Sequence, residues 1–149
     1  MPQSFASLHC HIVFSTKHRQ PVIERNVQPR LFEYIGGVLR NASCRLIAAG
    51  GMPDHVHLLT SLSRTITVAD AVRLIKANSS RWMHDELAVD NFWWQDGYGA
   101  FAVSYSNIEQ VKAYLANQEA HHRTATYQEE FRDFLRRNEL EWDERYVWD

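Results

Sequence analysis

The amino-acid sequence predicts an α+β domain, a ferredoxin-like split β-α-β antiparallel sheet with helices on one face and further helices after it. Three observations lead to this prediction. Strand-like and amphipathic helical segments follow one another in the order β-α-β-β-α-β. Only a short Gly- and Pro-containing turn separates the second and third strands, so these two form a hairpin. Helices follow the first and third strands, which is the split β-α-β arrangement.

The predicted strands are rich in β-branched and aromatic residues, and the short apolar runs end at Gly, Pro or charged residues. They span residues 7–16, 45–50, 55–62 and 100–104. The second and third of these strands are joined by the turn at residues 51–54.

The predicted helices carry an apolar residue at every third or fourth position. They span residues 27–39, 68–87, 108–121 and 127–138. Ser106 and Glu109 have the spacing of a capping box, which predicts the start of the third helix. The C-terminal tail after the last helix is aromatic.

Length and composition indicate one domain. The chain has 149 residues, of which 45% are hydrophobic and 23% charged, and this composition excludes a disordered or fibrous protein. We expect a single domain over residues 1–149, with a core at about 6–123 and a C-terminal helix and tail at about 124–149.

The near-neutral net charge of −2 hides an asymmetry along the chain. Residues 1–81 carry ten Lys and Arg against four acidic residues, whereas residues 82–149 carry six against fourteen. Indiscriminate coating of DNA needs clustered cations and is therefore not expected. The basic first part allows a local phosphate-binding face, although ordinary solvated surface charge explains the same counts.

Several features point to a cytoplasmic protein without a membrane partner. The longest apolar runs are far shorter than the ~18 residues that span a bilayer. The first residues lack the basic and apolar segments of a secretory signal. Two cysteines, Cys10 and Cys44, are too few for a disulfide framework.

His55 and His57 form the first candidate site. Side chains alternate across a strand, so these two histidines share one face, while Val56 and Leu58 point to the other. Two imidazoles on one face can converge on one divalent cation, or they are ordinary histidines on the open face of a sheet.

His9, Cys10 and His11 form a competing cluster in the first strand. Cys10 faces away from the two histidines, so the three side chains cannot bind one ion without distortion. The spacing is also unlike that of a structural zinc site. We therefore expect Cys10 in the core and no special role for His9.

The predicted helix 108–121 carries a third set of polar side chains. Tyr114 and Gln118, at i and i+4, lie on one face beside the apolar stripe, and His121 and His122 continue that face. Such a tyrosine usually packs in the core. Because a phenol has a pKa near ~10, it acts as a nucleophile only on an activated electrophile or with a base.

The motifs of several enzyme classes are missing. The sequence has no G-x-x-x-x-G-K-[ST], G-x-G-x-x-G, H-E-x-x-H or G-x-S-x-G motif. ATP use, dinucleotide redox chemistry and serine hydrolysis therefore have no support. Without a nucleotide-binding loop, an enzyme that breaks and remakes phosphodiester bonds must keep the energy of the broken bond. A covalent enzyme–phosphate intermediate does this.

Two motifs together carry a family resemblance. Residues 52–59, MPDHVHLL, resemble a P-D-H-V-H-L segment, and residues 111–118, VKAYLANQ, resemble a V-x-x-Y-I-x-x-Q helix. Similar supporting stretches lie at residues 11–19, 94–101 and 143–149. In order and spacing, nearly the whole chain resembles the HUH single-tyrosine transposases of the insertion sequence 200/605 group.

This resemblance implies a mechanism. His55, His57 and Gln118 would bind a divalent metal ion, Mg²⁺ or Mn²⁺. Tyr114 would attack the scissile phosphodiester, leaving a 5′-phosphotyrosine link and a free 3′-OH. A second 3′-OH would reverse the reaction and join new strands.

The resemblance also implies the partners. The expected substrate is single-stranded DNA with hairpin ends, and Lys17, Arg19 and Arg45 are candidate DNA-binding residues. A homodimer that shares its active sites between subunits is expected as well.

The residues alone are also compatible with other functions. A host-domesticated relative that processes repeated palindromes would keep the same site residues. A non-catalytic single-strand nucleic-acid-binding module would need neither metal nor Tyr114. A small metallohydrolase would use His55 and His57 with a water nucleophile, but the sequence offers no obvious carboxylate ligand for it.

Overall fold

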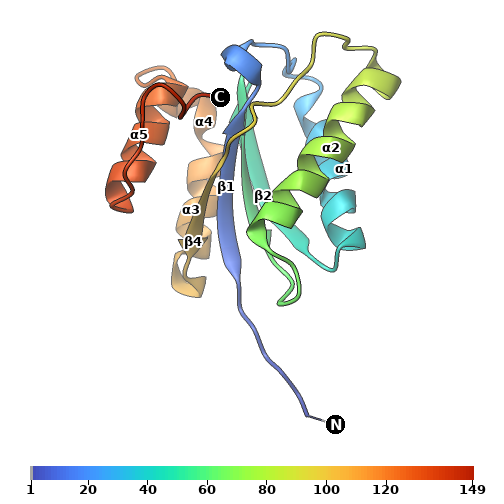
Figure 1. The fold of residues 1–149 in the computed structure, drawn as a ribbon, viewed down its shortest axis with the longest axis vertical. Coiled ribbons are helices and arrows are strands. Elements are labelled where there is room, and N and C mark those ends of the chain that lie inside the picture. Colours follow the sequence, from blue (N-terminus) through green and yellow to red (C-terminus); the bar gives the residue numbers. More distant parts are fainter. Residues whose placement is uncertain (1) are drawn as a thin grey trace.

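The computed structural model describes residues 2–149 as a four-stranded sheet with helices on both faces (Figure 1). The elements in chain order are β1 (His9–Ser15), η1 (Lys17–Arg19), α1 (Gln28–Asn41), β2 (Arg45–Met52), β3 (His55–Ser61), α2 (Val68–Leu87), β4 (Gly99–Val103), η2 (Tyr105–Asn107), α3 (Ile108–Ala116), α4 (Gln118–His121) and α5 (Tyr127–Arg137). Among these described residues, no helix is both long and apolar enough to cross a membrane.

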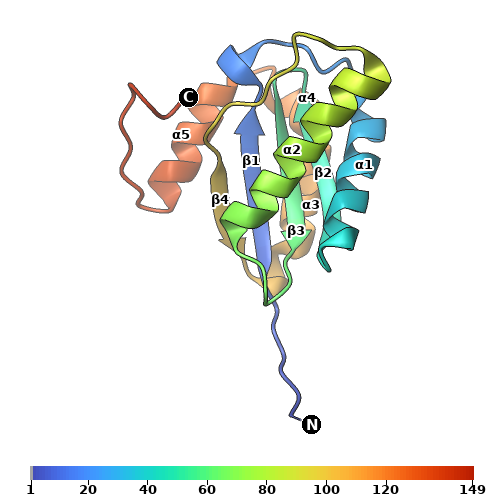
Figure 2. The same ribbon diagram turned by 45° about the vertical axis from the view of Figure 1, so that its right-hand side comes forward.

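The sheet has the strand order β2-β3-β1-β4, and every neighbouring pair is antiparallel (Figure 2). The hairpin of β2 and β3 places β3 beside β1 at the centre of the sheet. This is the ferredoxin-like arrangement, so the predicted fold class is confirmed. Strand boundaries differ from the predicted ones by one or two residues, which is the usual uncertainty of element ends.

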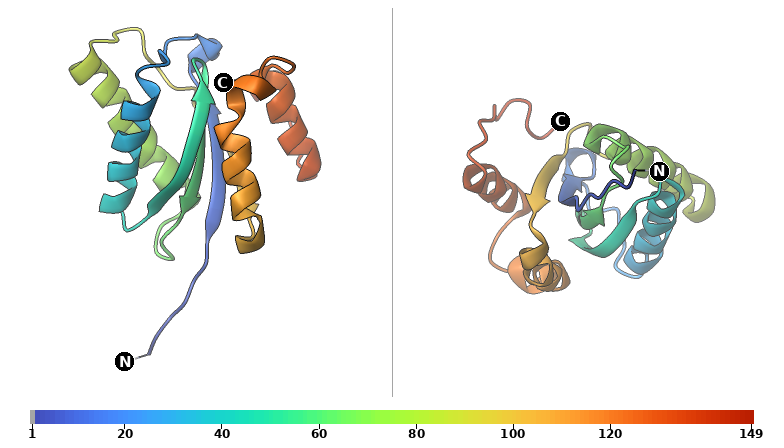
Figure 3. Two further views of the ribbon diagram at one scale, coloured as in Figure 1. Left: turned by 180° about the vertical axis from the view of Figure 1, so that it is seen from behind. Right: turned by 90° about the horizontal axis from the view of Figure 1, so that it is seen from below.

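One face of the sheet is covered by α1 and α2, as predicted (Figure 3). Alternate residues of the central strands point toward these two helices and form the main core. The buried apolar residues of this core include Ile12, Phe14, Val56, Leu58, Leu31, Ile35, Leu39, Val72 and Ile75. Cys10 belongs to the same core, as the sequence predicts.

The opposite face carries the C-terminal helices (Figure 3). A smaller core joins Val13 and Phe101 of the sheet to Tyr127, Phe131 and Leu135 of α5. α3 packs on the same face beside β2. A side chain at Gly50 would collide with α3, because an added Cβ would lie only 2.1 Å from the Leu115 carbonyl oxygen. The helix therefore approaches the sheet at a position without a side chain.

Two local predictions are wrong around α3. The Ser106 hydroxyl contacts the Ser104 hydroxyl, and no side chain caps the helix, which begins at Ile108 after the short turn η2. The predicted helix 108–121 is also interrupted at Asn117, so that α4 forms a separate turn. Periodicity alone did not reveal this break, because Asn fits both a helix and a turn.

Candidate active site

The histidine pair lies on the face covered by α3 and α5. His55 and His57 are both fully buried, and Val56 and Leu58 point into the main core on the other side. The sequence prediction of one shared face is thus confirmed. In the sheet, His57 is the neighbour of Val13 on β1 and of Gly50 on β2.

Each imidazole of the pair is held through its Nδ1 atom. His55 Nδ1 lies 2.7 Å from an Asp54 carboxylate oxygen, and His57 Nδ1 lies 2.9 Å from His11 Nε2. Burial lowers the pKa of His57 to about 4 and that of His11 to about 3, so both rings are neutral at pH 7. The Nε2 atoms of His55 and His57 consequently point into one shared space.

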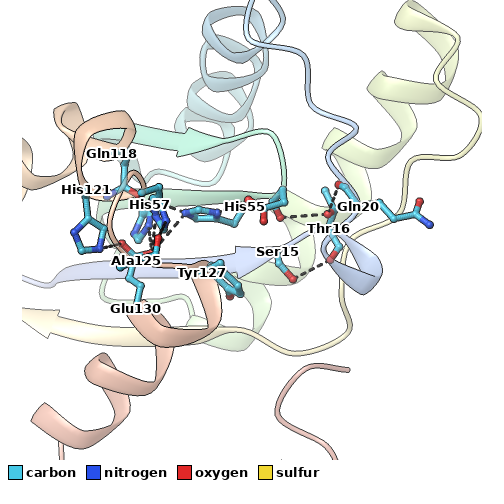
Figure 4. A network of polar contacts seen from close by, with 12 residues as sticks. Ser15, Thr16, Gln20, His55, His57, Gln118, His121, Ala125, Tyr127 and Glu130 are labelled. Carbon is cyan, nitrogen blue, oxygen red and sulfur yellow. Dashed lines mark hydrogen bonds and ion pairs between the residues drawn. The ribbon is translucent and has the colours of Figure 1, made fainter.

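Gln118 reaches this space from α4. Its side-chain oxygen lies 3.4 Å from His55 Nε2 and 3.0 Å from His122 Nε2, and the residue is 3% exposed. Figure 4 shows Gln118 beside His55 and His57, with Glu130 on the other side of the histidines. The break at Asn117 starts a new turn with Gln118, which follows Tyr114 by four residues.

Tyr114 contacts the same group of residues. Its hydroxyl donates a hydrogen bond to the Glu130 carboxylate, and its ring lies 5.8 Å from the ring of His57, centroid to centroid. Burial and the neighbouring Glu130 carboxylate raise the pKa of Tyr114 well above its usual range. The candidate nucleophile is therefore a neutral phenol beside the histidine pair of its own chain.

Glu130 of α5 is the centre of the polar cluster and is only 3% exposed. Its Oε1 atom lies 2.9 Å from His57 Nε2, 3.3 Å from His122 Nε2 and 3.5 Å from His55 Nε2. Burial opposes ionisation of this carboxyl, but its contacts with the imidazoles of His122 and His57 prevail and hold its pKa well below the usual range.

Glu130 is not predicted from the sequence, which offers no obvious carboxylate ligand for the histidine pair. The sequence nevertheless carries one indication that Glu130 is paired with other polar groups. Glu130 lies between Tyr127 and Phe131 on the buried stripe of α5, where a charged residue is unusual unless it is paired. From the sequence His122 is predicted only as a continuation of the tyrosine face, and its contact with Glu130 beside the histidine pair is not predicted.

The donor set fits a divalent metal ion. The ligand atoms of His55, His57, His122 and Glu130 all lie within 4.8 Å of one another. Neutral imidazoles and a carboxylate are common ligands of divalent first-row metals, and carboxylate also suits Mg²⁺. The competing cluster in β1 is not such a site, because only His11 contacts the histidine pair while Cys10 lies in the core.

The three candidate DNA-binding residues do not lie together. Lys17 and Arg19 follow the end of β1, the end at which Ser15 pairs with His55. Arg45 starts β2 at the opposite end, where it pairs with Ser61. The Arg19 guanidinium lies 5.7 Å from the centre of the Trp148 ring, so the C-terminal tail lies beside this turn.

Comparison with known proteins identifies the family. Residues 4–118 match the family model described as "Transposase IS200 like", and this match covers most of the chain. The chain belongs to the IS200-like transposases. Among its relatives is the ISDra2 transposase TnpA of Deinococcus radiodurans, which is 27% identical to this chain over 118 residues. The aligned region covers 74% of this chain and 84% of that protein.

Solved structures of transposases have the same fold. A crystal structure from Deinococcus radiodurans, assigned as a transposase, matches with a TM-score of 0.62 and 25% identity over 79% of this chain and 98% of that one. A REP-associated tyrosine transposase bound to a REP hairpin matches with a TM-score of 0.61 and 15% identity over 82% of this chain and 73% of that one. Tyr114 and the histidine pair thus lie in an IS200-like transposase fold.

Proposed function

We propose that this IS200-like transposase cleaves and rejoins single-stranded DNA with hairpin ends through a 5′-phosphotyrosine intermediate. One observation carries the proposal. The Tyr114 hydroxyl and the Nε2 atoms of His55 and His57 contact the same buried carboxylate, so nucleophile and candidate metal ligands face one small space.

His55, His57 and Gln118 would hold a divalent ion, Mg²⁺ or Mn²⁺. When bound, such an ion polarises the scissile phosphodiester and orients it for in-line attack. Asp54 orients the ring of His55, and His11 orients that of His57. These contacts keep both Nε2 atoms directed at the phosphate-binding space before DNA arrives.

Tyr114 supplies the nucleophile. Its oxygen forms a bond to the phosphorus while the bond from phosphorus to the 3′ oxygen breaks. The phenol gives up its proton in this step, and the departing 3′ oxygen takes up a proton from solvent to become a free 3′-OH. The raised pKa of Tyr114 makes free phenolate rare at neutral pH, so attack depends on a polarised phosphodiester. The bond energy is kept in the phosphotyrosine link, which agrees with the missing nucleotide-binding motif in the sequence.

Hairpin DNA as the substrate class is supported by the REP-associated tyrosine transposase of the same fold, which was solved with a REP hairpin. Lys17 and Arg19 are the stronger candidates for phosphate contacts, since both lie at the histidine end of the sheet. Arg45, at the other end, would contact a different part of the DNA.

The family membership also leads us to propose a homodimer. Within one chain, however, Tyr114 already contacts the carboxylate that faces its own histidines. We therefore propose that the dimer does not need an exchange of tyrosine helices to complete each active site.

The test is a cleavage assay on single-stranded DNA from both flanks of the gene, with Mn²⁺ or Mg²⁺. Wild-type protein should give a covalent protein–DNA band on a denaturing gel, and Tyr114→Phe should give none. Tyr105→Phe, at an 80% exposed tyrosine, is the matched control and should behave like wild type. Normal cleavage by Tyr114→Phe would contradict the proposal. Metal-dependent cutting without an adduct would indicate a hydrolase, and binding without cutting a nucleic-acid-binding module.

A further inference from the structure

We propose that the C-terminal segment of the chain completes the metal site, with His122 and Glu130 as ligands in addition to the histidine pair. This inference deepens the proposed function and rests on its metal dependence. Both residues lie beyond residue 118, where the match to the family model ends. His122 directly follows α4, and Glu130 lies in the first turns of α5.

The distances between the candidate ligand atoms are those of neighbouring ligands on one ion. Atoms bound to one metal at about 2.1–2.2 Å lie about 3.0–3.6 Å apart in octahedral or tetrahedral coordination. Glu130 Oε1 lies 2.9, 3.3 and 3.5 Å from the Nε2 atoms of His57, His122 and His55. One carboxylate oxygen thus lies 2.9–3.5 Å from three imidazole nitrogens, close to the separation of two atoms bound to the same ion.

All three imidazoles are held through Nδ1 and direct Nε2 at the Glu130 carboxylate. His55 is held through Nδ1 by Asp54, and His57 through Nδ1 by His11. His122 Nδ1 lies 2.8 Å from the carbonyl oxygen of Ala125. A histidine that donates its Nδ1–H to a carboxylate or backbone carbonyl presents Nε2 as a metal ligand, which is the usual pattern in metal sites. His122 is therefore held through Nδ1 as His55 is, with its Nε2 directed at Glu130.

The buried carboxylate of Glu130 also favours a cation at this site. The carboxylate is 3% exposed, and its ion-pair partners among residues 2–149 are all histidines rather than Lys or Arg. Burying a charge is favourable only when groups of opposite charge or hydrogen-bond donors lie beside it. A divalent ion between Glu130 and the imidazoles would compensate it.

The capping and packing of α5 place Glu130 beside the histidines. Thr126 caps α5 by accepting a hydrogen bond from the Glu129 backbone N–H, which sets the start of the helix. Phe131 and Leu135 then anchor α5 to the sheet in the smaller core. Glu130, on the same stripe, is directed at the histidines.

The test is the affinity of the metal-stripped full-length chain for Mn²⁺, measured by isothermal titration calorimetry without DNA. Glu130→Gln should bind Mn²⁺ more than about tenfold more weakly than wild type. Glu129→Gln is the matched control, since its exposed side chain touches none of the histidines, and it should bind like wild type. His122→Gln should also weaken binding and serves as a second variant if Glu130→Gln does not fold.

Wild-type affinity in a folded Glu130→Gln or His122→Gln protein would overturn the inference and leave the proposed function intact. Absence of Mn²⁺ binding by the wild-type chain would overturn both the inference and the metal dependence of the proposed function. Adduct formation by the wild-type chain distinguishes these cases. An adduct that forms only with Mn²⁺ or Mg²⁺ supports the proposed function even where Glu130→Gln binds Mn²⁺ like wild type.

Discussion

At the scale of single residues, the candidate site depends on side chains that hold the candidate metal ligands in place. Asp54 is the clearest example. It precedes His55 in the chain, its carboxylate lies 2.7 Å from His55 Nδ1, and its side chain is 30% exposed, whereas that of His55 is 1% exposed. The orientation of a buried ligand is thus set by a partly exposed neighbour.

Asp54→Ala is therefore expected to weaken Mn²⁺ binding by about 10–100-fold, the effect usual for partners that orient a metal-bound histidine. Calorimetric titration of the metal-stripped variant checks this value. Asp85→Ala, at an exposed position of α2, is the control and should bind Mn²⁺ like wild type. Equal affinities for the two variants would show that Asp54 does not orient a ligand.

The site residues differ in how far the sequence predicts them. His55 and His57 follow from strand alternation, and Tyr114 and Gln118 from helical spacing together with the family resemblance. Glu130 and His122 do not follow from local spacing, because they meet the pair only through the tertiary packing of α5. The contact between His57 and Glu130 joins residues 73 positions apart.

At the scale of secondary structure elements, the position of α3 is decided by Gly50. This residue lies opposite His57 in the sheet, and a Cβ there would meet the backbone of Leu115. Tyr114 precedes Leu115, so any outward shift of α3 would move the nucleophile away from the histidines. The strand pattern predicted β2, but only the packing of α3 explains why this position is glycine.

We expect Gly50→Ala to lower the free energy of unfolding by about 1–3 kcal/mol, as overpacking of a core usually does. Adduct formation should fall more steeply than the folded fraction, because Tyr114 is displaced. Urea denaturation and the cleavage gel measure the two effects. Gly37→Ala in α1 is the control. Its Cβ would have only ordinary contact with Arg40, and Ala favours a helix by up to about 1 kcal/mol. A Gly50→Ala protein with wild-type stability and activity would contradict this account.

Local periodicity predicted every helix and strand of the ferredoxin-like sheet, since each has its own apolar pattern. It did not predict the interruption at Asn117, where α3 ends and α4 begins. There, the Asn117 backbone N–H bonds the Tyr114 carbonyl, and its own carbonyl accepts from His121. Such a local rearrangement of hydrogen bonds leaves no mark on the apolar pattern.

At the scale of the whole molecule, one face of the sheet provides stability and the other provides the site. α1 and α2 close the main core, while α3 and α5 lie on the opposite face (Figure 3). There, Tyr114 of α3 and Glu130 of α5 contact each other, and Glu130 contacts the histidine pair. Strands β1 and β3 serve both faces, because alternate residues point into the core and into the site. Tyr114, the histidine pair and Glu130 of one chain lie together on this face.

A mixing experiment tests whether each chain uses its own tyrosine. Tyr114→Phe and His57→Ala proteins are each expected to be inactive, the first without a nucleophile and the second without a metal ligand. If each site is built within one chain, a co-expressed mixture of the two should stay inactive as well. Restored adduct formation in the mixture would instead show that subunits exchange tyrosine helices.

The most direct test of the central claim is to locate the DNA link in the covalent adduct by mass spectrometry. Trypsin cleavage after Lys112 and Arg123 releases residues 113–123, in which Tyr114 is the sole tyrosine. After nuclease digestion of the trapped adduct, this peptide is predicted to carry a nucleotide linked through its 5′ phosphate. A nucleotide on any other peptide, or an adduct that forms with an unmodified peptide 113–123, would contradict the assignment of Tyr114 as the nucleophile.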